Sequence, residues 1–461
     1  MSLIQKIMTS CYFCALCVLP LRAAEPPQVS IELSQMEQLA LQNSPLYQSA
    51  LQDARAAESR AEAMHGPVYP RLSIDGSYRY ITVVPELSLQ AGPLSVHQKL
   101  GDNTNYSVGP TLSWTAFDGG AVSNSYGSAL SDAKAKEQEA EAVRRQQLLL
   151  CRTLYFQLTL ASEQLVVLSN SVNLSNTQYD DITKQVRAGA KSRIDQLSAH
   201  QELLSRQQQL SRAQSDMAAA LRELAAITGT TPVLPETCIP ADKRVSGLLL
   251  QDTVKPTIIT QIDAVDNLLS RFAGYSGSKL WEAHPSLVAS QKLAESAHYA
   301  IMSADSAFWP RLQLTARTSL DYPNTMVLET INQNTFGANL SWSLFEGNGD
   351  RNRAASYHSQ ELSAQARREQ ISRSLFCDWA KAHDQLTALN RQRELAAQAA
   401  SEADELAAIA YKSYRAGSLT YLELQNANYK VLEAKLQLAR VQIQLLTTEA
   451  VLASLTSKEQ P

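Results

Sequence analysis

Long apolar runs are missing from most of this sequence. Beyond residue 24, no run approaches the roughly 18 apolar residues that a membrane-spanning helix needs, so we expect no transmembrane helix. Charge of one sign is not in excess either, because 41 basic residues nearly balance 45 acidic ones and the formal net charge is −4. The sequence therefore predicts no basic surface of the kind that attracts nucleic acid.

Cysteine and histidine are scarce. Of the six cysteines, three lie in the segment 1–24, and Cys151, Cys238 and Cys377 are far apart and odd in number. This pattern indicates neither a metal knuckle nor a disulfide framework, and it leaves the state of the three thiols open. The seven histidines stand singly, and no Gly-x-Ser-x-Gly, Walker or Rossmann motif occurs. We therefore predict no catalytic site, no metal site and no cofactor.

The segment 1–24 has the composition of an export signal. Lys6 precedes a mostly apolar stretch from Ile7 to Leu21, which small residues follow at Ala23 and Ala24. This order is typical of a secretory signal peptide that is cleaved near Ala23 or Ala24. A membrane anchor is the alternative, but about 15 apolar positions fall short of the roughly 20 that a spanning helix needs.

The rest of the chain contains an internal repeat. Short motifs recur at two fixed offsets, one near the start of each half and another further on, which predicts two copies of one unit. The matching pairs are Tyr69-Pro70-Arg71-Leu72 with Trp309-Pro310-Arg311-Leu312, Leu112–Gly119 with Leu340–Gly347, and Arg187–Gly189 with Arg415–Gly417. We divide the chain into a signal peptide at 1–24, a first repeat at 25–228, a linker at 229–284 with one short helix over 258–269, a second repeat at 285–457 and a tail at 458–461.

Each repeat contains two segments in which apolar and polar residues alternate strictly, as they do in strands. Each segment runs about ten residues, the length of a tilted membrane strand, and aromatic residues bracket the segments. These features are typical of a barrel with lipid outside and water inside. A half-exposed soluble sheet is the alternative, since it alternates in the same way. The apolar positions include Leu72, Ile74, Tyr78, Tyr80, Tyr106, Val108, Leu112, Trp114, Leu312, Leu314, Ala316, Phe336, Leu340, Trp342 and Leu344.

Helices with heptad spacing account for most of the remainder. Apolar residues recur at spacings of three and four from Leu154 to Val186, which predicts a left-handed coiled coil. A helix of about 70 residues is roughly 100 Å long, which no globular core needs. The Arg-Ala-Gly motifs at Arg187–Gly189 and Arg415–Gly417 predict tight turns, because glycine fits the left-handed end of a helix and arginine complements the helix dipole.

Four strands cannot close a barrel. Open strand edges are not tolerated in hydrocarbon, where each unpaired backbone group costs several kcal/mol, so we expect several chains to close it together. Two copies would supply eight strands, whose interior is filled by side chains, and three would supply 12 strands with room for water. A transport function would favour three.

The doubled order of Asn-Ser-Pro, strand pair, Ser-Trp-Thr-Ala-Phe-Asp-Gly-Gly and Arg-Ala-Gly resembles the TolC outer-membrane factor family, over essentially the whole chain after the signal. The resemblance implies a mainly α-helical fold with a β-stranded membrane part. It implies a homotrimer with a 12-stranded β-barrel, four strands per chain, continued by a long periplasmic α-helical barrel. It also implies contact with outer-membrane lipid, docking of a periplasmic adaptor protein, and an inner-membrane pump of the RND, ABC or MFS class.

The resemblance further implies a gate at the helix tips, held by polar links between neighbouring coiled coils. Asp195 and Tyr414 match a linked acid and tyrosine of the family, Glu423 matches an acidic ring in the constriction, and Asn426 sits where a second acid is common. A basic residue usual near Leu419 is absent. From its distance to the turn glycine, Glu423 is predicted about one and a half turns inside a helix.

The implied function is an exit duct for efflux or type I secretion, located in the bacterial outer membrane. The adaptor would dock at the tips, at Arg187, Gly189, Arg415 and Gly417. An exported coiled-coil scaffold or adhesin without a pore is the alternative, because export and heptads alone would suit it. The strand quartet favours the duct. The sequence does not identify the cargo or the pump.

Overall fold

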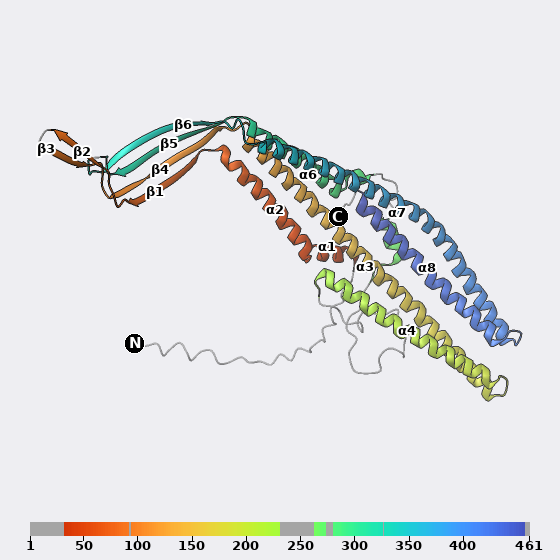
Figure 1. Ribbon diagram of the computed structural model, residues 1–461. Helices are drawn as coiled ribbons and strands as arrows, with labels where there is room; N and C mark the ends of the chain where they lie inside the picture. Colours follow the sequence, from red (N-terminus) through yellow and green to blue (C-terminus); the bar gives the residue numbers. More distant parts are fainter. Residues whose placement is uncertain (1–31, 92–93, 231–261, 273–279, 326, 457–461) are drawn as a thin grey trace, which may run out of the picture.

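The computed structural model describes residues 32–91, 94–230, 262–272, 280–325 and 327–456 of the chain. The predicted signal peptide at 1–24 and Cys238 lie outside these ranges. Figure 1 shows an elongated molecule with a β-sheet at one end and long helices that run from it to two tips at the other. Within the described ranges, no helix is both long enough and apolar enough to cross a membrane.

Two similar sets of elements follow one another along the chain. The first consists of α1 (Leu33–Gln42), α2 (Pro45–His65), η1 (Gly66–Val68), β1 (Arg71–Tyr80), β4 (Thr104–Phe117), α3 (Ala121–Arg187) and α4 (Arg193–Thr228). The second consists of α6 (Pro285–Asp305), η5 (Ser306–Phe308), β5 (Arg311–Tyr322), β6 (Ile331–Ser341), α7 (Gly349–Arg415) and α8 (Tyr421–Leu455). α3 and α7 contain 67 residues each, and α2 and α6 contain 21 each. The predicted duplication is confirmed.

The repeated Pro motifs begin equivalent helices. Ser44 accepts a hydrogen bond from the N–H of Tyr47 and caps α2, while Pro45 occupies the first turn, where no N–H is needed. His284 does the same for α6 by accepting from the N–H of Ser286. The two repeats therefore start their short helices by one mechanism with different capping residues.

β1, β4, β5 and β6 form one antiparallel sheet in that order, so the two predicted strands of each repeat are confirmed. The sheet crosses between the repeats, since β4 pairs with β5. β6 ends at Ser341, earlier than predicted, and Trp342 and Leu344 lie beyond it. An unpredicted hairpin of β2 (Glu86–Ala91) and β3 (Leu94–Lys99) joins β1 to β4 and projects beyond the outer end of the sheet (Figure 1).

The helices pack side by side in two zones along the length of the molecule, and α3 and α7 run through both zones (Figure 1). Beside the sheet, α2 packs on α3, α3 on α6 and α6 on α7. Toward the tips, α4 packs on α3, α3 on α8 and α8 on α7. The predicted heptad positions Leu158, Leu165, Val172, Leu203 and Leu210 are buried in the seams, as a coiled coil requires.

The segment between the repeats contributes α5 (Val265–Phe272) and the short η4 (Leu280–Ala283). α5 begins later than the predicted helix, whose first residues lie outside the described ranges. Glu37 of α1 accepts from Nε of Arg152 in α3 at 2.6 Å and from Nη2 of Arg271 in α5 at 2.8 Å. Glu37 and Arg152 are buried and Arg271 is exposed, so the carboxylate is paired on both sides and holds α1 and α5 to the middle of α3.

Candidate functional site

One face of the four-stranded sheet is apolar from edge to edge. The register places Leu72 of β1 beside Leu112 of β4, Leu112 beside Ala316 of β5, and Leu312 of β5 beside Leu340 of β6. The alternation read from the sequence is therefore confirmed. A single chain leaves the large side chains of this face exposed, and they are Leu72, Ile74, Tyr78, Tyr106, Val108, Leu112, Trp114, Leu314, Leu320, Phe336 and Leu340. An apolar surface of this extent marks a contact with lipid or protein.

The opposite face of the sheet carries charged and hydroxyl side chains. Ser107 donates through Oγ to Oδ1 of Asp321 at 2.5 Å and accepts from Nη2 of Arg317 at 2.9 Å. Ser319 donates to the other oxygen of Asp321 at 3.1 Å. The two bonds of Ser107 run across β4 and β5, the bond of Ser319 lies within β5, and together they satisfy the charges locally. The sheet thus separates an apolar side from a polar side, as a wall between lipid and water must.

A tryptophan in each repeat joins the sheet to the helices. Nε1 of Trp114 donates to the carbonyl oxygen of Val68, and Nε1 of Trp342 donates to that of Phe308, both at 3.1 Å. The two bonds occupy equivalent places in the repeats, and both rings remain 41% or more exposed. Such a ring, apolar in its body and polar at its N–H, suits a boundary between an apolar layer and water.

Both edges of the sheet are open. In the part of the chain that the structure describes, β1 pairs only with β4 and β6 only with β5. The helices continue the same two flanks, because α2 leads into β1 and α7 follows β6. One flank of the molecule therefore ends in β1 and α2, and the other ends in β6 and α7 (Figure 1).

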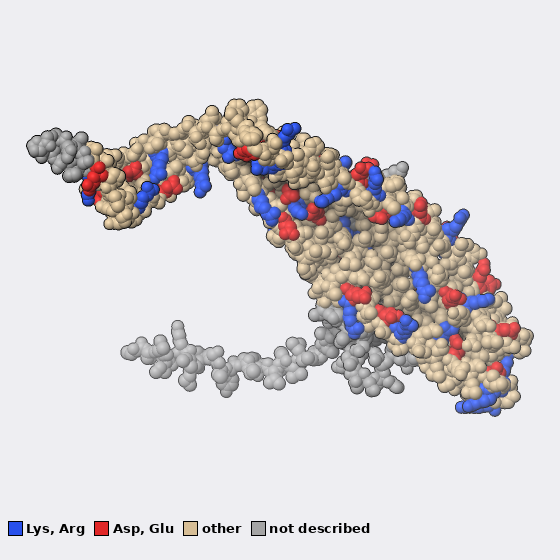
Figure 2. Space-filling view, in the orientation of Figure 1, with Lys and Arg blue, Asp and Glu red and all other residues tan. Residues whose placement is uncertain are grey.

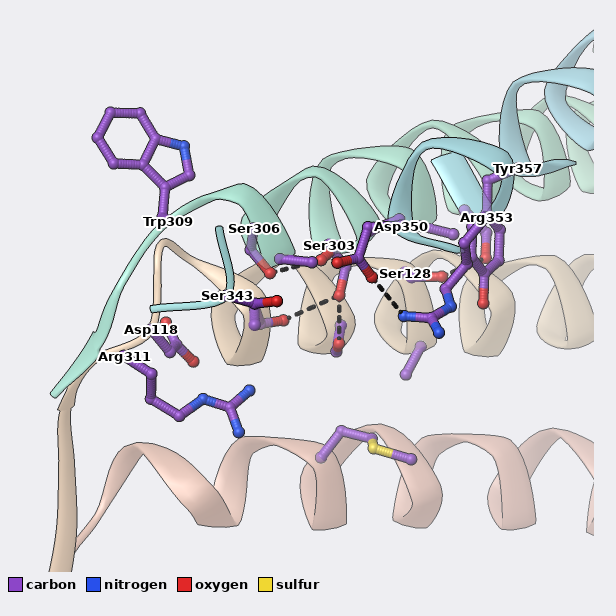
Figure 3. Close-up of a pocket in the computed structure, with 18 of the residues that line it drawn as sticks. Asp118, Ser128, Ser303, Ser306, Trp309, Arg311, Ser343, Asp350, Arg353 and Tyr357 are labelled. Carbon is purple, nitrogen blue, oxygen red and sulfur yellow. Dashed lines mark hydrogen bonds and ion pairs between the residues drawn. The ribbon is translucent and has the colours of Figure 1, made fainter. Parts of the chain in front are cut away.

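A recess of about 980 Å³ lies where the sheet meets the helices (Figure 3). Small side chains of α3 and α6 form part of its wall, where the hydroxyls of Ser125 and Ser303 share a hydrogen bond of 2.8 Å. Asp118 accepts from the N–H groups of Gly120 and Val122 at 2.9 Å, so it is bound to the start of α3.

The recess continues the polar face of the sheet. Arg311 and Ser341, which lie opposite each other on β5 and β6, both line it. Asp350 and Arg353 of α7 form an ion pair of 2.9 Å at its far side (Figure 3). Across the described ranges, no three His, Cys, Asp or Glu side chains are grouped to hold a metal ion.

At the other end of the molecule, each pair of long helices closes through a tight turn. Gly189 and Gly417 have φ angles of 73° and 79°, in the left-handed region that favours glycine. In the first turn, the N–H of Ala190 donates to the carbonyl of Gln185 at 2.9 Å, and that of Gly189 donates to Val186 at 3.0 Å. This is a Schellman motif, so the predicted turns are confirmed as turns.

The tips are basic. Arg187 ends α3 with Lys184 in the same helical turn, and Arg415 ends α7 with Lys412 in an equivalent place. Arg193 opens α4, and all of these side chains are exposed. Figure 2 shows lysine and arginine gathered at the end of the α3–α4 hairpin.

The two acidic residues predicted at the gate cap the returning helices. Oδ2 of Asp195 accepts from the N–H and hydroxyl of Ser192 at 3.3 and 3.1 Å. Oε2 of Glu423 accepts from the N–H and hydroxyl of Thr420, both at 2.8 Å. Glu423 is therefore the third residue of α8, and its predicted place one and a half turns inside a helix is wrong. The capping-box pattern, Ser or Thr followed three residues later by an acid, was visible in the sequence.

Tyr414 and Asn426 differ in their surroundings. Tyr414 is buried, its ring meets that of Tyr421 edge-on at 5.9 Å, and in the described residues its hydroxyl has no hydrogen-bond partner. Burial and the nearby charge of Asp195 raise the pKa of Tyr414, but the two side chains share no hydrogen bond. Asn426 is exposed on α8.

Polar contacts that the sequence analysis missed join the α3–α4 hairpin to the α7–α8 hairpin. Gln425 donates through Nε2 to Glu202 at 2.7 Å, and Asn428 donates through Nδ2 to Gln178 at 3.1 Å. A cavity of about 200 Å³ lies beside these contacts. Such pairs depend on how one coiled coil is rotated against the other, which residue spacing along the chain does not reveal.

A third contact of this kind lies closer to the tips. The hydroxyl of Tyr411 in α7 donates to Oδ2 of Asp181 in α3 at 3.4 Å. In addition, Nζ of Lys191, in the turn between α3 and α4, lies 4.3 Å from the ring centre of Tyr414. The links between the hairpins at the tips therefore differ from the predicted pair of Asp195 and Tyr414, whose side chains share no hydrogen bond in the described residues.

The sequence model of the outer membrane efflux protein family matches residues 37–230 and 277–458 of the chain. Comparison with curated proteins gives no match. Among solved structures, the chain is similar to CusC, with a TM-score of 0.72, 18% identity and coverage of 93% of each chain. It is similar to VceC from Vibrio cholerae, with a TM-score of 0.71, 19% identity and coverage of 92% of this chain and 95% of that one. The open state of the MtrE channel from Neisseria gonorrhoeae gives a TM-score of 0.68 and 16% identity, over 95% of this chain and 96% of that one.

Proposed function

The chain belongs to the outer membrane efflux protein family, and from this premise we propose that it forms the outer-membrane exit duct of a tripartite efflux or type I secretion system. In this function the duct conducts cargo passively from an inner-membrane pump across the periplasm and the outer membrane. The proteins to which it is similar include channels of known fold, and a channel needs no catalytic group. Cargo is selected by the pump.

The observation that carries the proposal is the sheet with two opposite faces and two open edges. An apolar face can lie in lipid only if no backbone group of the sheet remains unpaired there. The β6 edge of one chain must therefore pair with the β1 edge of the next. α7 of one chain then lies beside α2 and α4 of the next. The strands and the helices of a chain therefore pack against the same neighbouring chain along one flank.

This contact joins two different surfaces of neighbouring chains. Contacts of that type form a closed ring when the repeated rotation brings the last chain into contact with the first. Three chains supply 12 strands, which leave a water-filled interior. The polar face of the sheet and the recess that continues it then line the duct. The apolar face meets outer-membrane lipid.

We assign the tips to the periplasmic end, where Arg187, Gly189, Arg415 and Gly417 receive the adaptor protein that connects the duct to an RND, ABC or MFS pump. Exposed arginine and lysine at both turns favour an adaptor segment with acidic side chains, because complementary charge speeds association. The turns themselves expose backbone and the small residues Ala188 and Ala416, which allow close approach of a partner.

The constriction in this proposal consists of three copies of Glu423 and Asn426, with Asp195 and Tyr414 behind them. Glu423 is exposed, and its bonds to the backbone and hydroxyl of Thr420 lower its pKa, so its carboxylate is charged at neutral pH. Three such charges around one axis concentrate negative potential.

Fractionation of expressing cells and planar-bilayer recording of the purified full-length chain test the proposal. We expect the protein in the outer membrane, migration on gels that changes on heating, and discrete channel conductance. A coiled-coil scaffold or adhesin would give neither conductance nor heat-dependent migration. A protein that lacks channel conductance, or whose migration does not change on heating, would contradict the duct.

A further inference from the structure

We infer that Lys191 locks the two helical hairpins together at the end of the duct, by holding its ammonium group over the ring of Tyr414. The inference rests on the proposed duct function, and it concerns what sets the open probability of the entrance. Lys191 belongs to the turn between α3 and α4, whereas Tyr414 lies in the last turn of α7. The contact therefore joins the two repeats.

The geometry is that of a cation–π contact. Nζ of Lys191 lies 4.3 Å from the centre of the Tyr414 ring, inside the range of about 6 Å over which the ring attracts a cation. The ring is only 4% exposed, so little water screens the attraction. It is held in place by a cluster from both hairpins that consists of Ile182, Ala199, Ala410, Tyr421, Leu424 and Ala427.

The ring of Tyr414, rather than its hydroxyl, makes the link. In the described part of the chain the hydroxyl is buried and has no hydrogen-bond partner, although Asp195 is close enough for its charge to act on it. A hydroxyl link would be lost when the oxygen is removed. A ring link would survive that change, and this difference makes the inference testable.

The duplication explains why the lock has only one cation. Lys191 is the second residue after the turn glycine Gly189, and Leu419 is the second residue after the equivalent Gly417. Leu419 packs against the same apolar cluster. The cation thus comes from the first hairpin and the ring from the second, and the second turn carries no basic side chain at the equivalent place.

The lock lies nearer to the turns than the other links. Tyr411–Asp181 joins the hairpins further from the turns than Lys191 and Tyr414, and Gln425–Glu202 and Asn428–Gln178 join them further still along the helices. A motion that spreads the hairpins at their ends must therefore break the Lys191 contact first. In a ring of three chains, three such contacts would oppose opening.

Single-channel recording of the full-length protein in planar bilayers, without an adaptor, tests the inference. Lys191→Met removes the charge, and we expect open probability or mean conductance to rise at least about twofold, the factor that corresponds to a weak cation–π contact. Lys191→Arg keeps the charge and should behave like the parent protein. Lys430→Met is the matched control, because Lys430 is an exposed lysine of α8 that lies away from the turns.

Substitutions of the tyrosine complete the test. Tyr414→Phe keeps the ring and should stay closed, whereas Tyr414→Leu should open to the same degree as Lys191→Met. The double variant should open no further than either single one, because both remove one contact. Oligomer mass and heat-dependent gel migration establish that each variant is assembled.

Two results would overturn the lock. One is Lys191→Met with the conductance of the parent protein, and the other is Tyr414→Phe that opens as far as Tyr414→Leu, which would assign the link to the hydroxyl. If the parent protein formed no channel at all, the duct function itself would fail. The outcomes of the two proposals are thus distinguishable.

Discussion

Glu449 is an acidic side chain buried in α8. Its exposure is 8%, and its Oε2 has no hydrogen-bond partner in the described residues. Burial raises the pKa of this carboxyl to about 7, against the opposing charge of Arg393. Between its ordinary pKa near 4.5 and this value, the unfolded chain releases a proton that the folded chain retains. Stability contributed by this residue therefore falls as pH rises from about 4.5 to 7, and is constant above that range.

We predict that Glu449→Gln stabilises the protein at pH 8 and not at pH 4.5. The gain at pH 8 is at most about 3 kcal/mol per chain, from the size of the pKa shift. Thermal unfolding of the purified protein at the two pH values measures it. Glu433→Gln, an exposed acid on the same helix, should change neither. An equal effect of Glu449→Gln at both values would refute the buried-charge explanation.

Glu423 combines a structural bond with a proposed role in selectivity. Glu423→Gln retains a side-chain oxygen for the capping box and removes the charge, whereas Glu423→Ala removes both. We predict that both variants reduce cation preference and weaken block by multivalent cations, with a smaller change in conductance. Reversal potentials in asymmetric salt measure the preference. Unchanged selectivity in both would place the constriction elsewhere.

At the level of elements, the sheet could be predicted more fully than the tips. Alternation along β1, β4 and β5 encodes which side each residue faces, and the duplication doubled the signal. β2 and β3 were missed because their segment carries no repeat of this kind. The contacts of Tyr411, Gln425 and Asn428 depend on the rotation between coiled coils. The capping boxes at Ser192 and Thr420 were readable but were not recognised.

The two faces of β5 provide a direct test of the sheet. Leu314 lies on the apolar face between Trp114 and Ala338, and Thr315 lies on the polar face between Ser113 and Gly337. Leu314→Arg should cost about 2 to 4 kcal/mol near the centre of the bilayer. Thr315→Arg should be tolerated. Assembly yield and heat-dependent migration compare them, and equal damage from both would mean that the sheet does not separate lipid from water.

At the scale of the whole molecule, the described part of a single chain leaves several surfaces uncovered. β1 and β6 leave edges unpaired, an apolar sheet face is exposed, and α7 has few buried residues along its length. Large apolar side chains such as Leu362, Phe376 and Leu395 remain exposed on it. In the proposed ring, the strand edges and the exposed part of α7 lie where the neighbouring chain would pack, and the apolar sheet face lies where the ring would meet lipid. The same arrangement gives the duct its length, because α3 and α7 each span roughly 100 Å.

The mass of the detergent-extracted particle tests closure by several chains most directly. Native mass spectrometry or light scattering of the full-length protein, with detergent subtracted, should give three copies of the chain. Dilution should leave the trimer intact, because separation would expose two strand edges per chain to the apolar detergent core. A stable, folded monomer would contradict the account, since its sheet edges would then have no partner.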